Sequence, residues 1–347
     1  MRKWLQRPEG SNWGDFGDDD RIGRLNLINA EKVLEGIREV KEGKTFCLSL
    51  PLDYPGGNAL NINRNPPILR PLQRQGKVNF NCEMNQFDHE ISDVMSDDLA
   101  ILHLQYSTQW DAFAHVGTMF DLYKNGEEEA AYYNGFSARD SMIYPDCLED
   151  TGLQNIKSQS TSSAIKLGIE HLAEHGLQGR AVMIDLAHHL GTERTNVGYE
   201  IIKDIIEKDQ LKIGVGDILC LHTGYAEALL KMNKSPNIKV LNQTGAVLNG
   251  GDPKLLEWIT DSGIAAIAAD NYSVEEFPYS QRQSCCSALP LHQHCLFKLG
   301  IPLGELWYLT DLAKYLRNHH RSSFLLTAPP LRLTGAVGSP VTPIATV

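Results

Sequence analysis

The chain has 347 residues, of which 42% are hydrophobic and 22% charged, a composition typical of a soluble globular protein with enough apolar material for a core. Its formal net charge of −11 argues against nucleic acid and anionic membrane surfaces as partners, because both require a basic protein face. No apolar run approaches the length of a membrane span, and the basic start of the chain, up to Pro8, lacks the apolar segment of a signal peptide.

The first 88 residues predict a helix, a strand and a long irregular stretch. A helix is expected over residues 29–43, with Asn29 as its N-cap and Gly43 at its end, and a strand over residues 45–50. Residues 51–88 are rich in Pro, Gly and Asn, and a loop of this length is typical of a lid or a partner-binding arm. We expect residues 1–88 to pack on a core formed by residues 89–347, within one domain overall.

The segment from His103 to His115, HLQYSTQWDAFAH, carries a high density of polar groups suited to chemistry. The run from Ala100 alternates between apolar and polar residues from Leu102 onward, which predicts a strand that runs into this segment. If the strand continues, one face holds a row of polar side chains, namely His103, Gln105, Ser107, Gln109 and Asp111. Such a row offers groups for metal binding or proton transfer, and His115 is within reach if the chain turns after Asp111. An edge strand with a solvated polar face is the alternative that the alternation leaves open.

Strands and helices then alternate from residue 166 to residue 317. The expected elements are a helix at 166–175, a strand at 181–186, a helix at 201–206, a strand at 217–224, a helix at 252–261 and a strand at 264–270. This alternation predicts an α/β layered domain.

A second group of candidate site residues lies between Leu289 and Glu305. It contains His292 and His294, for which ordinary core or cap positions are an alternative explanation. Glu305 precedes an amphipathic pattern from Leu306 to Leu316 and is expected to open a helix. A carboxylate in a first helical turn is favoured by the helix dipole alone, so Glu305 also has a purely structural explanation.

Together these segments resemble the metal-binding residues of the cyclase family, metal-dependent amide hydrolases that include bacterial kynurenine formamidase. The family motif reads H-x-G-T-H-x-D-x-P-x-H, and Thr108, Asp111 and His115 match it. Gln105 and Gln109 stand where the family has its two early histidines. Ser107 and Phe113 likewise replace Gly and Pro.

The later family features, a histidine, a Gly-Ile-Pro-like turn and a glutamate, are matched by His292 or its rival His294, by residues 300–302 and by Glu305. The resemblance covers most of the chain from about residue 90 to the end. It implies a cyclase-like fold, a single layered domain with a central mixed β-sheet flanked by helices. It also implies a homo-oligomer, either a homodimer or a homotetramer.

In the two-metal members of the family, the early histidines and the Asp hold one ion, and the Asp, the late His and the Glu hold the other. Because amides replace the early imidazoles here, we expect one divalent ion held by Asp111, His292 and Glu305, with help from Gln109 and Gln105. An amide oxygen suits Mn²⁺ or Mg²⁺, whereas three protein ligands and a water are also a normal zinc arrangement. Manganese or zinc is therefore expected, with magnesium as a further option.

The resemblance implies a hydrolase that cleaves an amide, cyclic amide or ester bond of a small molecule by metal-activated water. His115 would act as general base and then protonate the leaving group, a role suited to a near-neutral pKa. Thr108 would orient the water or stabilise an oxyanion. Trp110 and Phe113 would bind an aromatic or mixed apolar substrate, although aromatic residues of a core show the same pattern.

Three other functions remain open at this point. The Gln-for-His replacements would also suit an inactive member of the fold that binds a small molecule. A thiol or serine hydrolase would use Cys285, Cys286 or Ser287 beside His292, although buried and inert cysteines are common. A lyase or isomerase acting through an enolate would use the same metal and base. The seven cysteines are otherwise scattered, without a C-x-x-C pair, and free thiols of this kind predict a reducing, cytoplasmic location.

Overall fold

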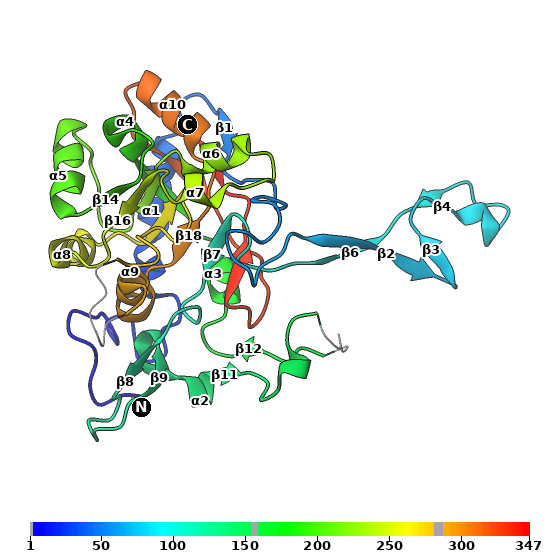
Figure 1. Ribbon diagram of the computed structural model, residues 1–347, viewed down its shortest axis with the longest axis horizontal. Coiled ribbons are helices and arrows are strands. Elements are labelled where there is room, and N and C mark those ends of the chain that lie inside the picture. Colours follow the sequence, from blue (N-terminus) through cyan, green and yellow to red (C-terminus); the bar gives the residue numbers. More distant parts are fainter. Residues whose placement is uncertain (1–2, 154–158, 281–286) are drawn as a thin grey trace.

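The computed structural model describes residues 3–153, 159–280 and 287–347, and its centre is a nine-stranded sheet (Figure 1). The strands of this sheet are β1 (Thr45–Cys47), β7 (Gln109–Asp111), β13 (Gln178–Asp185), β15 (Ile218–His222), β17 (Ala266–Ala269), β18 (Leu303–Glu305), β19 (Ser323–Thr327), β20 (Gly338–Pro340) and β21 (Ile344–Thr346). Their order across the sheet is β1-β21-β19-β13-β15-β17-β18-β7-β20. The central strands β13, β15, β17 and β18 run parallel, and the pairings outside them are antiparallel. The expected mixed α/β sheet is confirmed.

Helices cover the sheet, as the alternation of strand and helix predicted. They are α1 (Ala30–Arg38), α2 (Ala138–Ser141), α3 (Glu170–His175), α4 (Leu186–Leu190), α5 (Tyr199–Lys208), α6 (Tyr225–Lys231), α7 (Ile238–Leu241), α8 (Pro253–Ser262), α9 (Pro290–His292) and α10 (Thr310–Asn318). Every residue of β15 and β17 is buried, which explains why both read as continuous apolar runs in the sequence. Helix α1 packs on β13 and β19, and Gly36 permits the close approach, because a Cβ there would lie 2.9 Å from the backbone of Gly179.

The helix ends follow their local sequence. Asn29 caps α1 by accepting a hydrogen bond from the backbone N–H of Lys32, and Asp252 caps α8 in the same way through Lys254. Gly176 and Gly263 end α3 and α8 with φ values of 92° and 68°. Helix α1 stops at Arg38, earlier than the expected end at Gly43.

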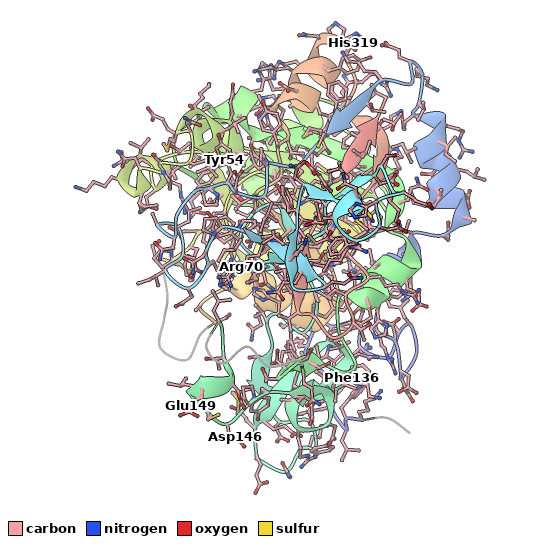
Figure 2. The ribbon with its side chains drawn as sticks, turned by 90° about the vertical axis from the view of Figure 1, so that its right-hand side faces the viewer. Tyr54, Arg70, Phe136, Asp146, Glu149 and His319 are labelled. Atoms are coloured by element: carbon pink, nitrogen blue, oxygen red, sulfur yellow. The ribbon has the colours of Figure 1, made fainter. Side chains whose placement is uncertain are left out.

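A β-ribbon, here called the arm and defined as residues 66–102, projects away from the sheet (Figure 1). Its elements are β2 (Ile68–Arg74), β3 (Lys77–Asn79), β4 (Cys82–Glu83), the 3₁₀ turn η2 (Met84–Gln86), β5 (Val94–Met95) and β6 (Asp98–Ile101). Figure 2 looks along the arm, with Arg70 of β2 near the centre of the view. The expected boundary at residue 88 falls inside this arm, which extends outward instead of packing on the core, whereas β1 belongs to the central sheet.

The strand expected to run from residue 100 into the HLQYSTQWDAFAH segment is interrupted. Strand β6 ends at Ile101 in the arm, and β7 begins at Gln109 in the central sheet. Between them the chain turns, and His103 Nδ1 lies 3.1 Å from the carbonyl oxygen of Asn65 at the root of the arm. The single polar face from residue 103 to residue 111 therefore does not form, and only Gln109 and Asp111 share a face in β7.

Smaller sheets complete the fold. Their strands are β8 (Thr118–Phe120), β9 (Glu129–Tyr132) and β10 (Phe136–Ser137), then β11 (Met142–Ile143) with β12 (Ser163–Ala164), and β14 (Thr195–Val197) with β16 (Ala246–Leu248). The remaining helical segments are the 3₁₀ turns η1 (Gly23–Leu27), η3 (Tyr133–Gly135) and η4 (Leu148–Asp150), and the π-helical η5 (Gln293–Leu299). Within the described residues, no helix combines the length and the apolar character needed to span a membrane.

Candidate metal centre

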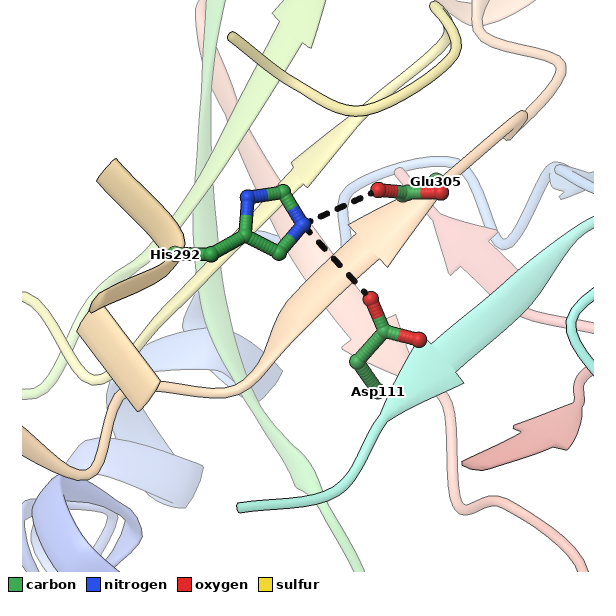
Figure 3. A group of neighbouring side chains, drawn as sticks. All are labelled: Asp111, His292 and Glu305. Atoms are coloured by element: carbon green, nitrogen blue, oxygen red, sulfur yellow. Dashed lines mark hydrogen bonds and ion pairs between the residues drawn. The ribbon is translucent and has the colours of Figure 1, made fainter. Parts of the chain in front are cut away.

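Three buried side chains from different elements meet at one end of the central sheet (Figure 3). Asp111 ends β7, Glu305 ends β18 and His292 lies in α9, and one ligand atom of each lies within 4.8 Å of the other two. His292 Nε2 is 3.2 Å from a carboxylate oxygen of Glu305 and 3.9 Å from Oδ2 of Asp111. These are the three residues expected to hold a divalent ion.

The pairing of β7 with β18 places the two carboxylates on one face. Asp111 pairs with Leu303 and Glu305 pairs with Gln109, so the carboxylates are diagonal neighbours across the strand pair. The expectation that Glu305 opens a helix is wrong, because it lies in β18 and α10 begins only at Thr310. Its position is therefore not explained by a helix dipole.

Gln109 joins the two carboxylates. Its Nε2 donates to Oδ1 of Asp111 over 3.2 Å and to Oε2 of Glu305 over 3.1 Å. Its own Oε1, like Oδ2 of Asp111, is buried without a hydrogen-bond partner among the residues described. Buried acceptors without partners are costly, and a bound cation would satisfy Oδ2 of Asp111 directly and Oε1 of Gln109 once its amide group turned over. Two carboxylates, one imidazole and an amide oxygen form a donor set that fits a divalent ion.

The charges around His292 support the same fit. Burial raises the pKa of Asp111, and the negative charge of Glu305 adds to this effect against the opposing influence of His115. Burial opposes ionisation of Glu305 as well, but its hydrogen bond to His292 and the positive charges nearby together outweigh burial and lower its pKa. Burial disfavours a charged His292, yet the bonds to Glu275 and Glu305 raise its pKa. Three buried carboxyl groups thus surround one imidazole, and a divalent cation would balance them.

Glu275 orients His292 from the far side of the ring. One of its carboxylate oxygens lies 2.7 Å from His292 Nδ1, and the carboxylate also accepts from the backbone N–H groups of Leu291 and His292 over 2.9 Å each. With Nδ1 donating to Glu275, Nε2 faces the other two carboxylates, which is the common support for a metal-binding histidine. The sequence did not reveal this role, because Glu275 belongs to no recognised motif and its spacing from His292 carries no signal.

His115 lies beside the three residues, as expected. The chain turns after Asp111, and His115 Nε2 is 3.9 Å from Oδ1 of that carboxylate. His115 lines a cavity of about 130 Å³ together with Arg64, Tyr272, His292 and Glu305. The side chain is 23% exposed, so it can exchange protons with solvent while facing the cavity.

Two other predicted residues have different surroundings. The Thr108 hydroxyl donates to the carbonyl of Leu306 and accepts from the backbone N–H of Leu50, so it ties β7 to its neighbours. The Gln105 side chain lies against Gly338, and its buried Nε2 has no hydrogen-bond partner among the described residues. Neither side chain lines the cavity next to the carboxylates.

Trp110 and Phe113 are fully buried in the core. The Trp110 indole donates to the carbonyl of Ala328 and packs edge-on against Trp307, and Phe113 packs against Tyr133. Neither ring lines the cavity, where the aromatic side chains are Tyr272 and Phe277.

The rival site residues are also placed. His294 points away from the carboxylates and its Nε2 pairs with Thr260 Oγ1 over 2.9 Å, while burial lowers its pKa to about 4. The structure therefore brings His292, and not His294, to the carboxylates. Cys285 and Cys286 lie outside the described residues, and the Ser287 hydroxyl accepts a hydrogen bond from the backbone of Leu289.

Comparison with known proteins identifies the family. A family model described as "Putative cyclase" matches residues 49–276, beginning well before residue 90 and ending before His292 and Glu305. A solved structure described as a novel cyclase superposes with a TM-score of 0.73 at 28% identity, over 97% of both chains. No curated protein matches the sequence.

Two isatin hydrolases share the fold at low identity. Isatin hydrolase A from Labrenzia aggregata, bound to benzyl benzoate, has a TM-score of 0.55 at 12% identity over 91% of this chain and 98% of that one. The enzyme of the same name from Ralstonia solanacearum has a TM-score of 0.53 at 13% identity over 87% and 91% of the two chains. Since the family model covers well over half of the sequence and the fold agrees, the chain belongs to the cyclase family.

Proposed function

We propose that the protein is a metal-dependent hydrolase that cleaves an amide, cyclic amide or ester bond of a small molecule. The observation that carries this proposal is the meeting of Asp111, His292 and Glu305 beside a small cavity that His115 also lines. The likeness to isatin hydrolases supports a C–N bond as the target, in the manner of an arylformamidase or a cyclic amidase.

Asp111, His292 and Glu305 would hold one divalent ion, manganese or zinc, with magnesium as a further option. Gln109 would join them through its unpaired Oε1 if the amide group turned over. When bound, the ion would polarise the scissile carbonyl and lower the pKa of a water molecule.

The protein side chains would manage the protons. His115 would accept a proton as water adds to the carbonyl carbon, and would return it to the nitrogen as the C–N bond breaks. The products are then a carboxylate and an amine. The cavity has a volume of about 130 Å³, which suits a small molecule.

The test begins with metal-loaded protein, isatin and N-formylaniline as trial substrates, and elemental analysis of each variant. We expect His115→Asn to lose about 10²- to 10⁴-fold in turnover while keeping its metal, because a general base contributes about that factor. Asp111→Asn should lose both metal and turnover. His103→Asn, which changes a histidine at the root of the arm, is the matched control and should resemble the wild type.

Two results would contradict the proposal. One is full activity of His115→Asn, which would show that His115 is not the general base. The other is full activity of metal-free protein after treatment with a chelator. Hydrolysis blocked by thiol alkylation but insensitive to a chelator would instead support the cysteine alternative.

The hydrogen bonds of Gln109 favour a second candidate function, an inactive member of the fold that binds a small molecule. An amide that donates to both carboxylates can neutralise their repulsion in part without an ion. Protein that takes up no stoichiometric metal and still binds a ligand in the cavity would support this second function.

We further propose that the chain forms a homo-oligomer in a reducing cytoplasm. The projecting arm supports self-association, and five free cysteines among the described residues support the compartment. The mass of the protein in solution tests whether it forms a homo-oligomer.

A further inference from the structure

Arg64 reaches the candidate metal centre from the irregular stretch before the arm. Its Nη1 donates to the carbonyl oxygen of Gln105 over 2.7 Å, and its backbone N–H donates to that of Asn61 over 3.0 Å. These two bonds fix both ends of the residue. Its half-buried side chain lines the same cavity as His115 and Glu305, so its guanidinium is held at the wall of this cavity.

Arg64 lines the same cavity as His292 and Glu305, and its guanidinium is not neutralised by an ion pair with any described residue. Within the described part of the chain, no carboxylate oxygen lies within the 4.0 Å of Arg64 that defines an ion pair. Arg64 is also the only lysine or arginine among the described residues that line the cavity.

The rest of the cavity wall is aromatic and polar. The rings of Tyr272 and Phe277 lie edge to face, 6.3 Å apart, and the Tyr272 hydroxyl accepts a hydrogen bond from Asn61. A ligand in this cavity would therefore contact the Arg64 guanidinium, two aromatic rings and the metal-binding residues His292 and Glu305.

We propose that Arg64 determines specificity by binding an anionic oxygen of the ligand, so that the site takes small aromatic molecules that carry a carboxylate. A guanidinium matches the planar geometry of a carboxylate and donates to it through more than one N–H group. This proposal deepens the proposed hydrolase function, because hydrolysis of an amide leaves a carboxylate. It rests on that function only in treating the ligand as a substrate or product. The binding of the anion itself does not require hydrolysis.

The competing explanation is that Arg64 only ties the root of the arm to the Gln105 carbonyl. Arg64→Gln separates the two explanations, because a glutamine can still donate to a carbonyl but carries no charge. Arg64→Lys keeps the charge and loses the planar fork. Arg70→Gln, at an exposed arginine in the arm, is the matched control.

The experiment measures binding of benzoate and of its neutral isostere benzamide to manganese-loaded protein by calorimetry, with the metal content of each variant determined. We expect Arg64→Gln to weaken benzoate binding at least tenfold and benzamide binding less than threefold, with metal content unchanged. Arg64→Lys should lie between the wild type and Arg64→Gln, and Arg70→Gln should match the wild type.

A second measurement needs no variant. Benzoate should slow the modification of Arg64 by phenylglyoxal, followed by mass spectrometry, and leave the modification rate of Arg70 unchanged. The proposal is overturned if the wild-type protein does not bind benzoate, if benzoate does not protect Arg64, or if Arg64→Gln weakens both ligands equally. If neither isatin, N-formylaniline nor 2-formamidobenzoate, which carries the carboxylate, is hydrolysed but the benzoate results hold, the hydrolase proposal fails and the anion site stands.

Discussion

His292 lies among three carboxylates that have different tasks. Glu305 and Asp111 lie near the Nε2 atom of the imidazole, where an ion would bind. Glu275 instead accepts hydrogen bonds from Nδ1 and from the backbone N–H groups of Leu291 and His292. Because Glu275 fixes the orientation of the imidazole, its removal should disturb metal binding without removing any ligand atom.

Glu275→Gln should therefore weaken manganese binding about 10- to 100-fold, the usual effect of losing the partner of a metal-binding histidine. The amide has one acceptor oxygen where the carboxylate has two, so the N–H groups of Leu291 and His292 and the imidazole Nδ1 cannot all keep their bonds. The dissociation constant for Mn²⁺, measured by calorimetry, checks this. Glu276→Gln is the neighbouring control, and an equal affinity in the two variants would argue against an orienting role.

The sequence identified four residues that do meet, Asp111, His115, His292 and Glu305. The family motif contains the first two, and the later family features contain a glutamate and a histidine for which His292 and His294 both stayed open. The sequence did not reveal Arg64 or Glu275, since both lie in stretches without periodicity and act only once the chain has folded. Trp110 was assigned a substrate role, although its position in β7, opposite in parity to Gln109 and Asp111, turns it toward the core.

At the level of elements, the carboxyl ends of the parallel strands carry a second group of buried charges. His222 ends β15, and its Nδ1 lies 2.6 Å from Asp185 at the end of β13, while its Nε2 is 3.3 Å from the Thr310 hydroxyl in α10. Arg317 of α10 also donates to Asp185. This group thus links two central strands to the helix that covers them.

The stability of this link should depend on pH in a defined window. Burial disfavours a charged His222, but the Asp185 hydrogen bond and the charges of Asp270 and Asp185 outweigh it and raise its pKa above 6.5. Burial likewise opposes ionisation of Asp185, and His222 nevertheless lowers its pKa below 3.8. The stabilisation that His222 contributes is complete below pH 6.5 and is lost as pH rises through its raised pKa in the folded protein. The stabilisation that Asp185 contributes is complete above pH 3.8 and is lost as pH falls through its lowered pKa in the folded protein.

His222→Gln should therefore cost about 1–3 kcal/mol of unfolding free energy between pH 3.8 and 6.5, and progressively less as pH rises further. Urea unfolding at a series of pH values measures this cost. His89→Gln, at an exposed position in the arm, is the control and should cost little at any pH. A cost for His222→Gln that does not change with pH would show that the charged pair is not its source.

Local patterns predicted the elements whose neighbours follow directly in the chain, such as α5, α8, β13 and β15. These patterns failed where a strand pairs with a strand that lies far away in the sequence. Alternation around residue 100 suggested one strand, but β6 pairs with β2 in the arm and β7 pairs with β18 and β20, so the chain turns between them. The helix expected from Glu305 is delayed because Leu306 has a φ of 55°, a left-handed conformation that a helix does not accept.

At the level of the whole molecule, the arm is the part that does not pack on the central core. It exposes large apolar side chains, with Leu69 67%, Val78 61% and Phe80 56% accessible. A ribbon of few strands is marginally stable in water, and exposed apolar strands tend to pair with another chain. In the proposed homo-oligomer, a second copy of this chain would cover the exposed apolar side chains of the arm.

Excision of the arm tests this proposal. Ile68 and Ile101 face each other in the β2–β6 pair, so Asn-Gly can replace residues 69–100 as a two-residue turn without moving the ends. The excised protein should keep its metal, because no ligand residue lies in the arm, and its mass by analytical ultracentrifugation should fall from that of an oligomer to that of a monomer. As a control, Arg70→Gln keeps the apolar surface and should keep the oligomer. A full-length monomer would contradict the homo-oligomer, and an excised protein of unchanged oligomeric state would place the interface on the core.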